Sequence, residues 1–215
     1  MKKILSLAVA VSFFLFGCSN GSQQKSNAGN TDSSALQENG YSKVAVIDSL
    51  RLEWTGYKTT SKTPVKGVFN TLTLEGEDKS GKTPREVLDG ATATATVASL
   101  FSDNEERDSK LIKIFFGAMN ETPILKAALH FKDNKPYLSI TMNGVTKDIE
   151  VADSFENNIY TLEGNMKLSD FNAQKALQAL NKACLDLHKG ADGISKTWDD
   201  VHFKGAVYFA PSFGK

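Results

Sequence analysis

Regular alternation of apolar and polar residues is the feature that most constrains how this chain can fold. Leu50, Leu52 and Trp54 are separated by polar residues, and Leu138 and Ile140 are spaced in the same way. Successive side chains of a strand point to opposite faces of a sheet, so a period of two with one apolar face predicts a half-buried strand. The same interpretation extends to the segments 65–74, 91–97, 125–131, 146–151, 160–168 and 201–209.

Turn residues between these segments favour antiparallel pairing. Asn143-Gly144 and the run 133–136 stand between neighbouring strand candidates, and such residues are typical of tight hairpin turns. About eight antiparallel strands joined by short turns predict a mainly β domain, built as a closed barrel or as a sandwich.

Two segments have helical rather than alternating spacing. The clearer one is 172–188, and we expect Gly190 to end it. Its apolar stripe consists of Ala173, Ala176, Leu177, Leu180, Ala183, Cys184 and Leu187. We expect this longer helix, placed before the last strand, to pack against the barrel or to close one of its mouths. A shorter helical segment is expected at 108–119.

The N-terminus has the pattern of an export signal. Lys2 and Lys3 precede an apolar run at 4–16, and the small residue Gly17 follows it. The run is shorter than the roughly 20 apolar residues that cross a bilayer, so a transmembrane anchor is the weaker alternative. Cys18 directly after Gly17 resembles the lipobox of bacterial lipoproteins, which implies cleavage after residue 17 and acylation of Cys18.

This resemblance implies a protein held in the bacterial cell envelope by a lipid anchor. Several acyl chains per molecule exceed the single chain that gives only marginal membrane binding. Ser19 and Asn20 lack the Asp that retains some lipoproteins at the inner membrane, which favours the outer membrane, facing the periplasm. Residues 18–40 are rich in Ser, Asn, Gln and Gly, and we interpret them as a flexible linker.

The remaining residues, 41–215, are long enough for a single globular domain. The chain carries 25 basic and 25 acidic residues, and this balance argues against a nucleic-acid partner, whose recognition needs a cationic surface. Once Cys18 is acylated, only Cys184 remains, so no internal disulfide can form.

No catalytic pattern is found in the sequence, and we expect no enzyme activity. His130, His188 and His202 have no Cys or carboxylate at metal-ligand spacing, so we expect no metal site. The sequence has no Gly-x-Ser-x-Gly motif. Arg107-Asp108 is either a catalytic or head-group pair or, more often for such residues, a helix cap with a salt bridge.

An ordered set of short motifs resembles the YceI-like family over residues 44–210. The motifs are Trp54-Thr55-Gly56, Val65-Lys66-Gly67-Val68-Phe69, Arg107-Asp108-Ser109-Lys110-Leu111, Met142-Asn143-Gly144-Val145-Thr146-Lys147 and Leu168-Ser169-Asp170-Phe171. The resemblance implies an extended eight-stranded antiparallel barrel, similar to lipocalins, whose apolar interior holds an isoprenoid or another amphiphilic chain. The chain departs from the family at Ser109-Lys110, at Ser169 and in the length of its segment 172–190.

The alternation and the resemblance together predict which side chains face the interior and contact a ligand. The predicted residues are Trp54, Phe69, Ala95, Leu129, Phe131, Leu138, Ile140, Met142, Leu162, Met166, Phe203 and Val207. The small residues Ala91, Ala93, Ala95, Gly164 and Gly205 favour an open cavity. The alternative is a packed core, because alternation identifies an inner face but no space behind it.

Two functions follow from these interpretations. The first is a carrier or sequestering protein for a long apolar lipid of the isoprenoid or quinone type, with no other cofactor. The alternative is a surface interaction or assembly module with a filled core and no ligand.

Overall fold

The computed structural model describes residues 41–42, 50–76, 80–120 and 122–209. The chain divides into a unit of residues 1–36 and a unit of residues 37–215, and the described residues all belong to the second unit. The predicted signal segment 1–17, Cys18 and the linker 18–40 therefore lie outside the described residues.

Two antiparallel sheets make up most of the second unit, which confirms the prediction of a mainly β, antiparallel protein. The five-stranded sheet has the order β10 (Val145–Glu150), β9 (Lys135–Met142), β8 (Ile124–Lys132), β6 (Thr92–Thr96) and β4 (Leu72–Glu75). The six-stranded sheet has the order β11 (Ala152–Glu156), β12 (Ile159–Lys167), β13 (Asp200–Tyr208), β2 (Leu50–Lys58), β3 (Thr63–Phe69) and β7 (Leu100–Phe101). A further small sheet pairs β1 (Tyr41–Ser42) with β5 (Ser80–Gly81).

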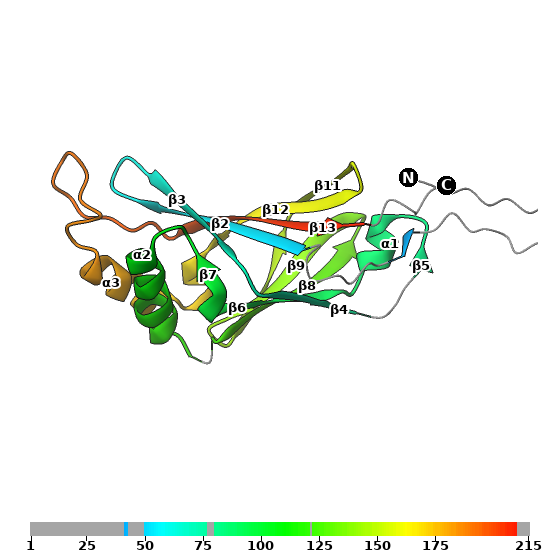
Figure 1. The fold of residues 1–215 in the computed structure, drawn as a ribbon, viewed down its shortest axis with the longest axis horizontal. Helices are drawn as coiled ribbons and strands as arrows, with labels where there is room; N and C mark the ends of the chain where they lie inside the picture. Colours follow the sequence, from blue (N-terminus) through cyan, green and yellow to red (C-terminus); the bar gives the residue numbers. More distant parts are fainter. Residues whose placement is uncertain (1–40, 43–49, 77–79, 121, 210–215) are drawn as a thin grey trace, which may run out of the picture. The chain divides into compact units, whose positions relative to one another are not determined.

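The chain crosses between the two large sheets at four places, and two of these connections are only one or two residues long. Val151, which is buried, joins β10 to β11, and Asn70 and Thr71 join β3 to β4. The two sheets lie face to face (Figure 1). Their inner faces carry most of the alternating apolar residues that the sequence pattern identified.

The prediction of one closed, eight-stranded barrel was wrong in its closure and its strand count. Among the described residues, the hydrogen-bonded ladders form separate sheets with more than eight strands. The predicted strand 65–74 shows the reason, because the chain bends after Phe69 and splits this segment into β3 and β4. The backbone N–H groups of Asn70 and Thr71 donate to Ser99 O and Oγ at 3.0 and 2.9 Å, and these bonds hold the bend.

Helices lie at both ends of the sheets (Figure 1), and they are more numerous than the two helical segments, 108–119 and 172–188, that the sequence pattern predicted. At one end lies α1 (Pro84–Leu88), with Thr83 as its N-cap. At the other end lie α2 (Glu105–Lys110), the π-helix η3 (Leu111–Phe115), the 3-10 helices η4 (Phe116–Ala118) and η5 (Leu168–Phe171), and α3 (Gln174–Ala183). A short 3-10 helix, η2 (Val97–Ser99), connects β6 to β7.

Helix α3 is shorter than the predicted segment 172–188. Asn172 adopts a left-handed conformation, with φ of 54°, so the α-helix begins only after it. Residues 184–188 form turns, and the predicted stop at Gly190 lies beyond the true end. The predicted stripe is correct for Ala173, Ala176, Leu180 and Cys184, which are buried, whereas Leu187 is 56% exposed.

Candidate functional site

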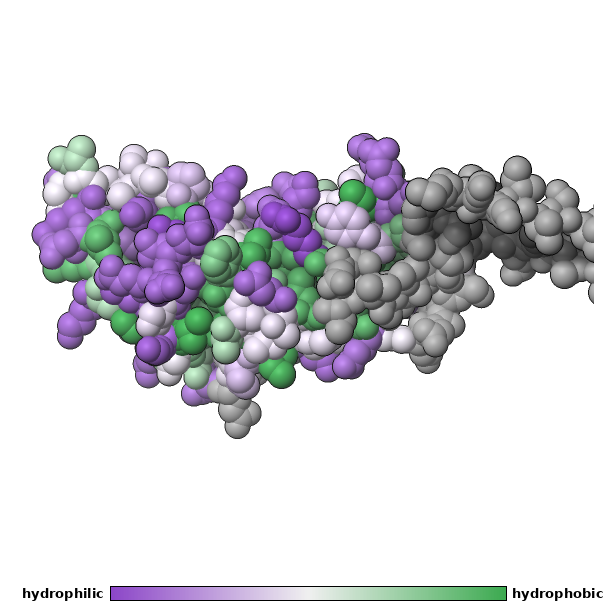
Figure 2. Space-filling view, viewed as in Figure 1, coloured by the Kyte–Doolittle hydropathy of each residue, from purple (hydrophilic) through white to green (hydrophobic). Residues whose placement is uncertain are grey.

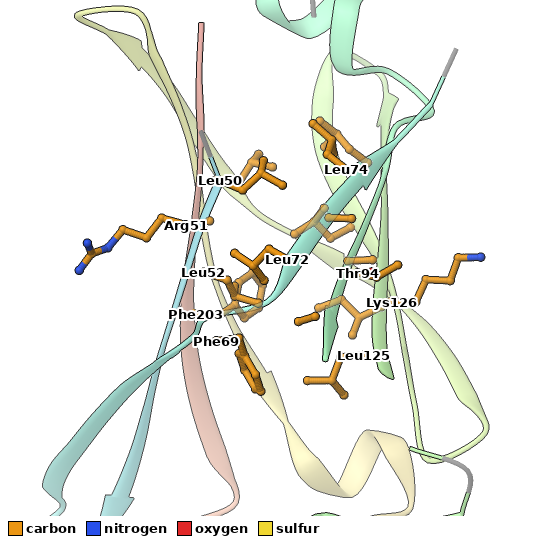
Figure 3. Close-up of a pocket in the computed structure, with 18 of the residues that line it drawn as sticks. Leu50, Arg51, Leu52, Phe69, Leu72, Leu74, Thr94, Leu125, Lys126 and Phe203 are labelled. Atoms are coloured by element: carbon orange, nitrogen blue, oxygen red, sulfur yellow. The ribbon is translucent and has the colours of Figure 1, made fainter. Parts of the chain in front are cut away.

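An apolar cavity of about 180 Å³ lies between the two large sheets. Both sheets and α1 contribute to its wall, and Figure 3 shows the leucine and phenylalanine side chains that converge on it. Its apolar lining consists of Leu50, Leu52, Trp54, Phe69, Leu72, Leu74, Leu88, Ala91, Ala93, Ala95, Leu125, Ala127, Leu129, Leu138, Ile140, Met142, Leu162, Met166, Val201, Phe203, Gly205, Ala206 and Val207.

Strand alternation produces this lining. On β2, Leu50 and Leu52 line the cavity, while the side chain of Arg51 between them points away from it (Figure 3). Lys126 on β8 likewise points away from the cavity. The wall is therefore hydrocarbon, and no charged side chain of the described residues that line it points inward.

Tyr160 is the one tyrosine on the described cavity wall, and its hydroxyl is held by a polar cluster. The residue is 2% exposed, and its hydroxyl donates to Asp153 Oδ2 at 2.5 Å. Arg85 on α1 donates to both carboxylate oxygens of Asp153 at 2.7 Å, and its Nη1 donates to Asn134 Oδ1 at 2.9 Å. We call Arg85, Asn134, Asp153 and Tyr160 the polar latch. It joins α1 to both sheets, because Asn134 lies in the β8–β9 turn and Asp153 lies on β11.

The polar latch shifts the pKa values of its members in opposite directions. The hydrogen bonds from Arg85 lower the pKa of the Asp153 carboxyl, and the bond from Tyr160 adds to this effect. Burial raises the pKa of the Tyr160 hydroxyl well above 10, with a further contribution from the hydrogen bond to Asp153. Asp153 is therefore ionised and Tyr160 protonated at neutral pH.

Trp54 is held closely against the wall formed by β3. A Cβ atom on Gly67 would lie 2.4 Å from Trp54 Cζ2, so only glycine fits opposite this indole ring. The indole Nε1 is buried, and it has no hydrogen-bond partner within the part of the chain that the structure describes. Trp54 therefore contributes an aromatic surface to the cavity rather than a polar contact.

The structure brings the predicted ligand residues together on the cavity wall, with one exception. Phe131 lies outside the cavity and packs on the core near α1. The guanidinium of Arg85 lies 5.5 Å from the centre of its ring. Gly164 also does not line the cavity, because the Phe203 ring fills the space where its side chain would be. The other small residues, Ala91, Ala93, Ala95 and Gly205, all line it.

Several lining residues were absent from the predicted set. Leu50 and Leu52 were recognised as strand residues, and Leu72 and Leu74 lay inside the segment 65–74, which was treated as one strand. Alternation alone would have included Leu50 and Leu52. Leu72 and Leu74 are out of phase with Phe69 in a single strand, and they line the cavity because the chain bends between Phe69 and Leu72. Leu88 comes from α1, which the pattern analysis missed, although Thr83-Pro84-Arg85-Glu86 carries a helix-start signature: an N-cap threonine, an early proline and a glutamate at N3.

The other candidate residues have local structural partners. Asp108 accepts hydrogen bonds from the backbone N–H and the hydroxyl of Ser102, and Arg107 Nη1 donates to Ser102 O at 3.3 Å. These contacts tie α2 to the residues before it, whereas the N-cap of the helix is Asn104, whose Oδ1 accepts a hydrogen bond from the backbone N–H of Arg107 at 2.8 Å. Burial lowers the pKa of His188 to about 4. No group of three or more metal-ligating side chains occurs in the ranges that the structure covers.

The fold and the cavity define a mainly β protein with an apolar cavity between antiparallel sheets. A family model described as the YceI-like domain matches residues 40–206. The chain therefore belongs to the YceI-like family, which confirms the resemblance found in the sequence.

Several solved structures are similar to this chain at low sequence identity. A polyisoprenoid-binding domain from Saccharophagus degradans matches with a TM-score of 0.56 and 10% identity, over 79% of this chain and 97% of that chain. Burkholderia cenocepacia BcnA matches with a TM-score of 0.48 and 17% identity, over 76% and 98% of the two chains. The Campylobacter jejuni YCEI protein matches with a TM-score of 0.39 and 22% identity, over 62% and 81%. No curated protein is a significant match to the chain.

Proposed function

We propose that this protein binds the hydrocarbon chain of an isoprenoid or quinone-type lipid between its sheets, as a carrier or sequestering protein. The observation that carries the proposal is the continuous apolar wall of the cavity. Each buried methylene of a ligand is worth about 0.8 kcal/mol, and a wall without charges offers the ligand no competing polar contact. The polyisoprenoid-binding domain from Saccharophagus degradans, which shares the fold, supports this ligand class.

The size of the cavity limits how much of a ligand it can enclose. An apolar cavity of about 150 Å³ in a protein interior holds a molecule of the size of benzene, and this cavity measures about 180 Å³. A ring or one to two isoprene units would therefore fit without rearrangement. A longer chain would have to extend beyond the cavity or separate the sheets.

We expect lipid to remain with the protein when it is purified from native membranes. Extraction of the purified protein followed by lipid mass spectrometry should detect an apolar lipid in a fixed ratio to protein, because the cavity shields the chain from water. The Ala95→Phe variant, purified in the same way, is the control for lipid that adheres non-specifically. Protein that is folded but free of lipid would favour the surface interaction module.

We further propose that the protein is a lipoprotein of the bacterial cell envelope, anchored through Cys18 at the outer membrane and facing the periplasm. The support is the arrangement of Lys2, Lys3, the apolar run 4–16, Gly17 and Cys18. Within the described ranges, no helix is both long and apolar enough to cross a membrane. An anchored domain would meet its lipid ligand at the membrane surface.

Replacing Cys18 with serine should release the protein from membranes, because serine cannot accept the thioether-linked lipid. We expect the wild-type protein to fractionate with membranes and to need detergent for extraction. The variant should lose the mass of the acyl groups and the requirement for detergent. Cys184→Ser is the matched control, and it should leave fractionation unchanged. A Cys18→Ser variant that stays membrane-bound to the same degree would contradict the anchoring proposal.

A further inference from the structure

The hydrogen-bonded ladder around the cavity is interrupted where β2 begins. Leu50 to Leu52 pair with β13, since Leu50 lies opposite Val207 and Leu52 opposite Gly205. On its other side, β2 pairs with β3 only from Glu53 onward. The first three residues of β2 therefore have one side of their backbone unpaired among the residues that the structure describes.

Strand β4 presents a second unpaired edge to the same region. Its residues pair with β6 from Leu72 to Glu75, and they have no other strand partner in the described part of the chain. The bend at Asn70 and Thr71, which Ser99 holds, directs β4 into the five-stranded sheet and away from β2. The two edges consequently lie near each other and are joined by side-chain packing instead of a hydrogen-bonded ladder.

The rim of this gap in the ladder is apolar. Leu50 and Leu52 stand on one side and Leu72 and Leu74 on the other (Figure 3), and Leu50 and Leu52 pack against the core cluster that contains Leu72. We call these four leucines the slit rim. Leu50, Leu52 and Leu74 are partly exposed, and Figure 2 shows hydrophobic residues at the surface between β2 and β4. Arg51, which lies between Leu50 and Leu52, points outward and pairs with Glu53 at 2.6 Å.

Both ends of the cavity are more tightly packed than the slit rim. At the α1 end, Val87 and Leu88 are each 1% exposed, and the polar latch holds α1 in place. At the opposite end, Phe116 of η4 packs on Phe69 of the wall with ring centres 6.5 Å apart. Entry at either end would require a helix to move.

We propose that the slit rim is a lateral portal, through which an uncharged hydrocarbon chain enters the cavity sideways between β2 and β4. This inference rests on the proposed function and adds the route of entry. An apolar rim lets a chain pass from a membrane into the cavity with little exposure to water, which is the costly state for such a chain. A charged head group would stay outside, because neither the rim nor the described wall presents an inward-facing charge to pair with it.

A cleavable crosslink across the slit rim tests this route. Leu50→Cys and Leu74→Cys would be introduced together in the full chain carrying Cys18→Ser and Cys184→Ala, and joined by a bis-maleimide that contains a disulfide. The probe is the uncharged fluorophore N-phenylnaphthylamine. When the protein is loaded before crosslinking, we expect release of the probe to slow by roughly tenfold or more, a barrier about 1.4 kcal/mol higher. Reduction of the crosslinker should restore the original rate.

The control pair is Glu53→Cys with Lys204→Cys, which lie opposite each other on β2 and β13 and do not span the slit. The crosslink between them should leave the release rate unchanged. Unchanged release from the protein crosslinked at Leu50 and Leu74 would overturn the portal while the proposed function stands. An uncrosslinked protein that takes up no probe would overturn the proposed function and the portal with it.

Discussion

Replacing Ala95 with phenylalanine is expected to remove most lipid binding while the protein remains folded. Ala95 lines the cavity and is 2% exposed, and it packs with Phe69, Leu72 and Leu100. The added ring can be placed only toward the cavity, where it takes the space of part of the ligand. Loss of about three methylene contacts, at about 0.8 kcal/mol each, would weaken binding roughly fiftyfold. Co-purified lipid and thermal stability should be measured on the same sample.

The control for Ala95→Phe is Lys126→Phe, which adds a ring to the neighbouring strand β8 on a side chain that points away from the cavity. It should leave lipid binding unchanged. If the interior were a filled core, Ala95→Phe would overpack it and cost about 1–3 kcal/mol of stability. A fall of several degrees in the melting temperature, together with lipid-free wild-type protein, would lead us to prefer the surface interaction module.

The second large effect is expected from Asp153→Ala, which breaks the polar latch. The Tyr160 hydroxyl would lose its acceptor while buried, and an unsatisfied buried polar group costs about 1–3 kcal/mol. Arg85 would lose both bonds to the carboxylate, but its side chain is 36% exposed and can be hydrated again. At about 2–4 °C per kcal/mol for a domain of this size, the melting temperature should fall by about 2–12 °C. Glu150→Gln, at a side chain that is 54% exposed, is the control and should change it little.

The polar latch also predicts how stability depends on pH. The pKa of Asp153 is lower in the folded protein than its usual value of 3.8, so its contribution is complete above that value and is lost as the pH falls further. The pKa of Tyr160 is raised above 10.0, so its contribution is complete below pH 10 and is lost as the pH rises beyond it. Asp153→Ala should therefore flatten the acid side of the stability profile, as measured by thermal melts between about pH 2 and 7. If the stability of the variant falls with decreasing pH as steeply as that of the wild type, other carboxyl groups cause the fall.

Local alternation was sufficient to predict the strands and most of the cavity wall. The pattern of Leu50, Leu52 and Trp54 depends only on the two-residue period of a strand, and such a period is visible in the sequence. The arrangement of the strands was less predictable. The bend after Phe69 depends on hydrogen bonds to Ser99, which is far along the chain. The local sign of the bend is only a shift of the two-residue period between Phe69 and Leu72.

The errors at Phe131 and Leu187 have a common cause. Both residues follow the periodic pattern of their segment, but each lies near or beyond the end of its strand or helix. Phe131 lies near the end of β8, where Arg85 covers its ring, and Leu187 lies in the turns after α3. Periodicity identifies a face of an element, whereas tertiary structure decides where that face ceases to meet the cavity or the core.

The position of β13 has a consequence for how the protein is made. This strand lies between β12 and β2, so Trp54 finds its partner Phe203 only after all the residues between them have been synthesised. Contacts between residues so distant in sequence form slowly, because a long loop must close before they gain stability. The six-stranded sheet thus cannot be completed before β13 has been made, and the precursor stays open until then. That delay suits the export we propose, since a chain that has not yet folded is the form that can be threaded across a membrane.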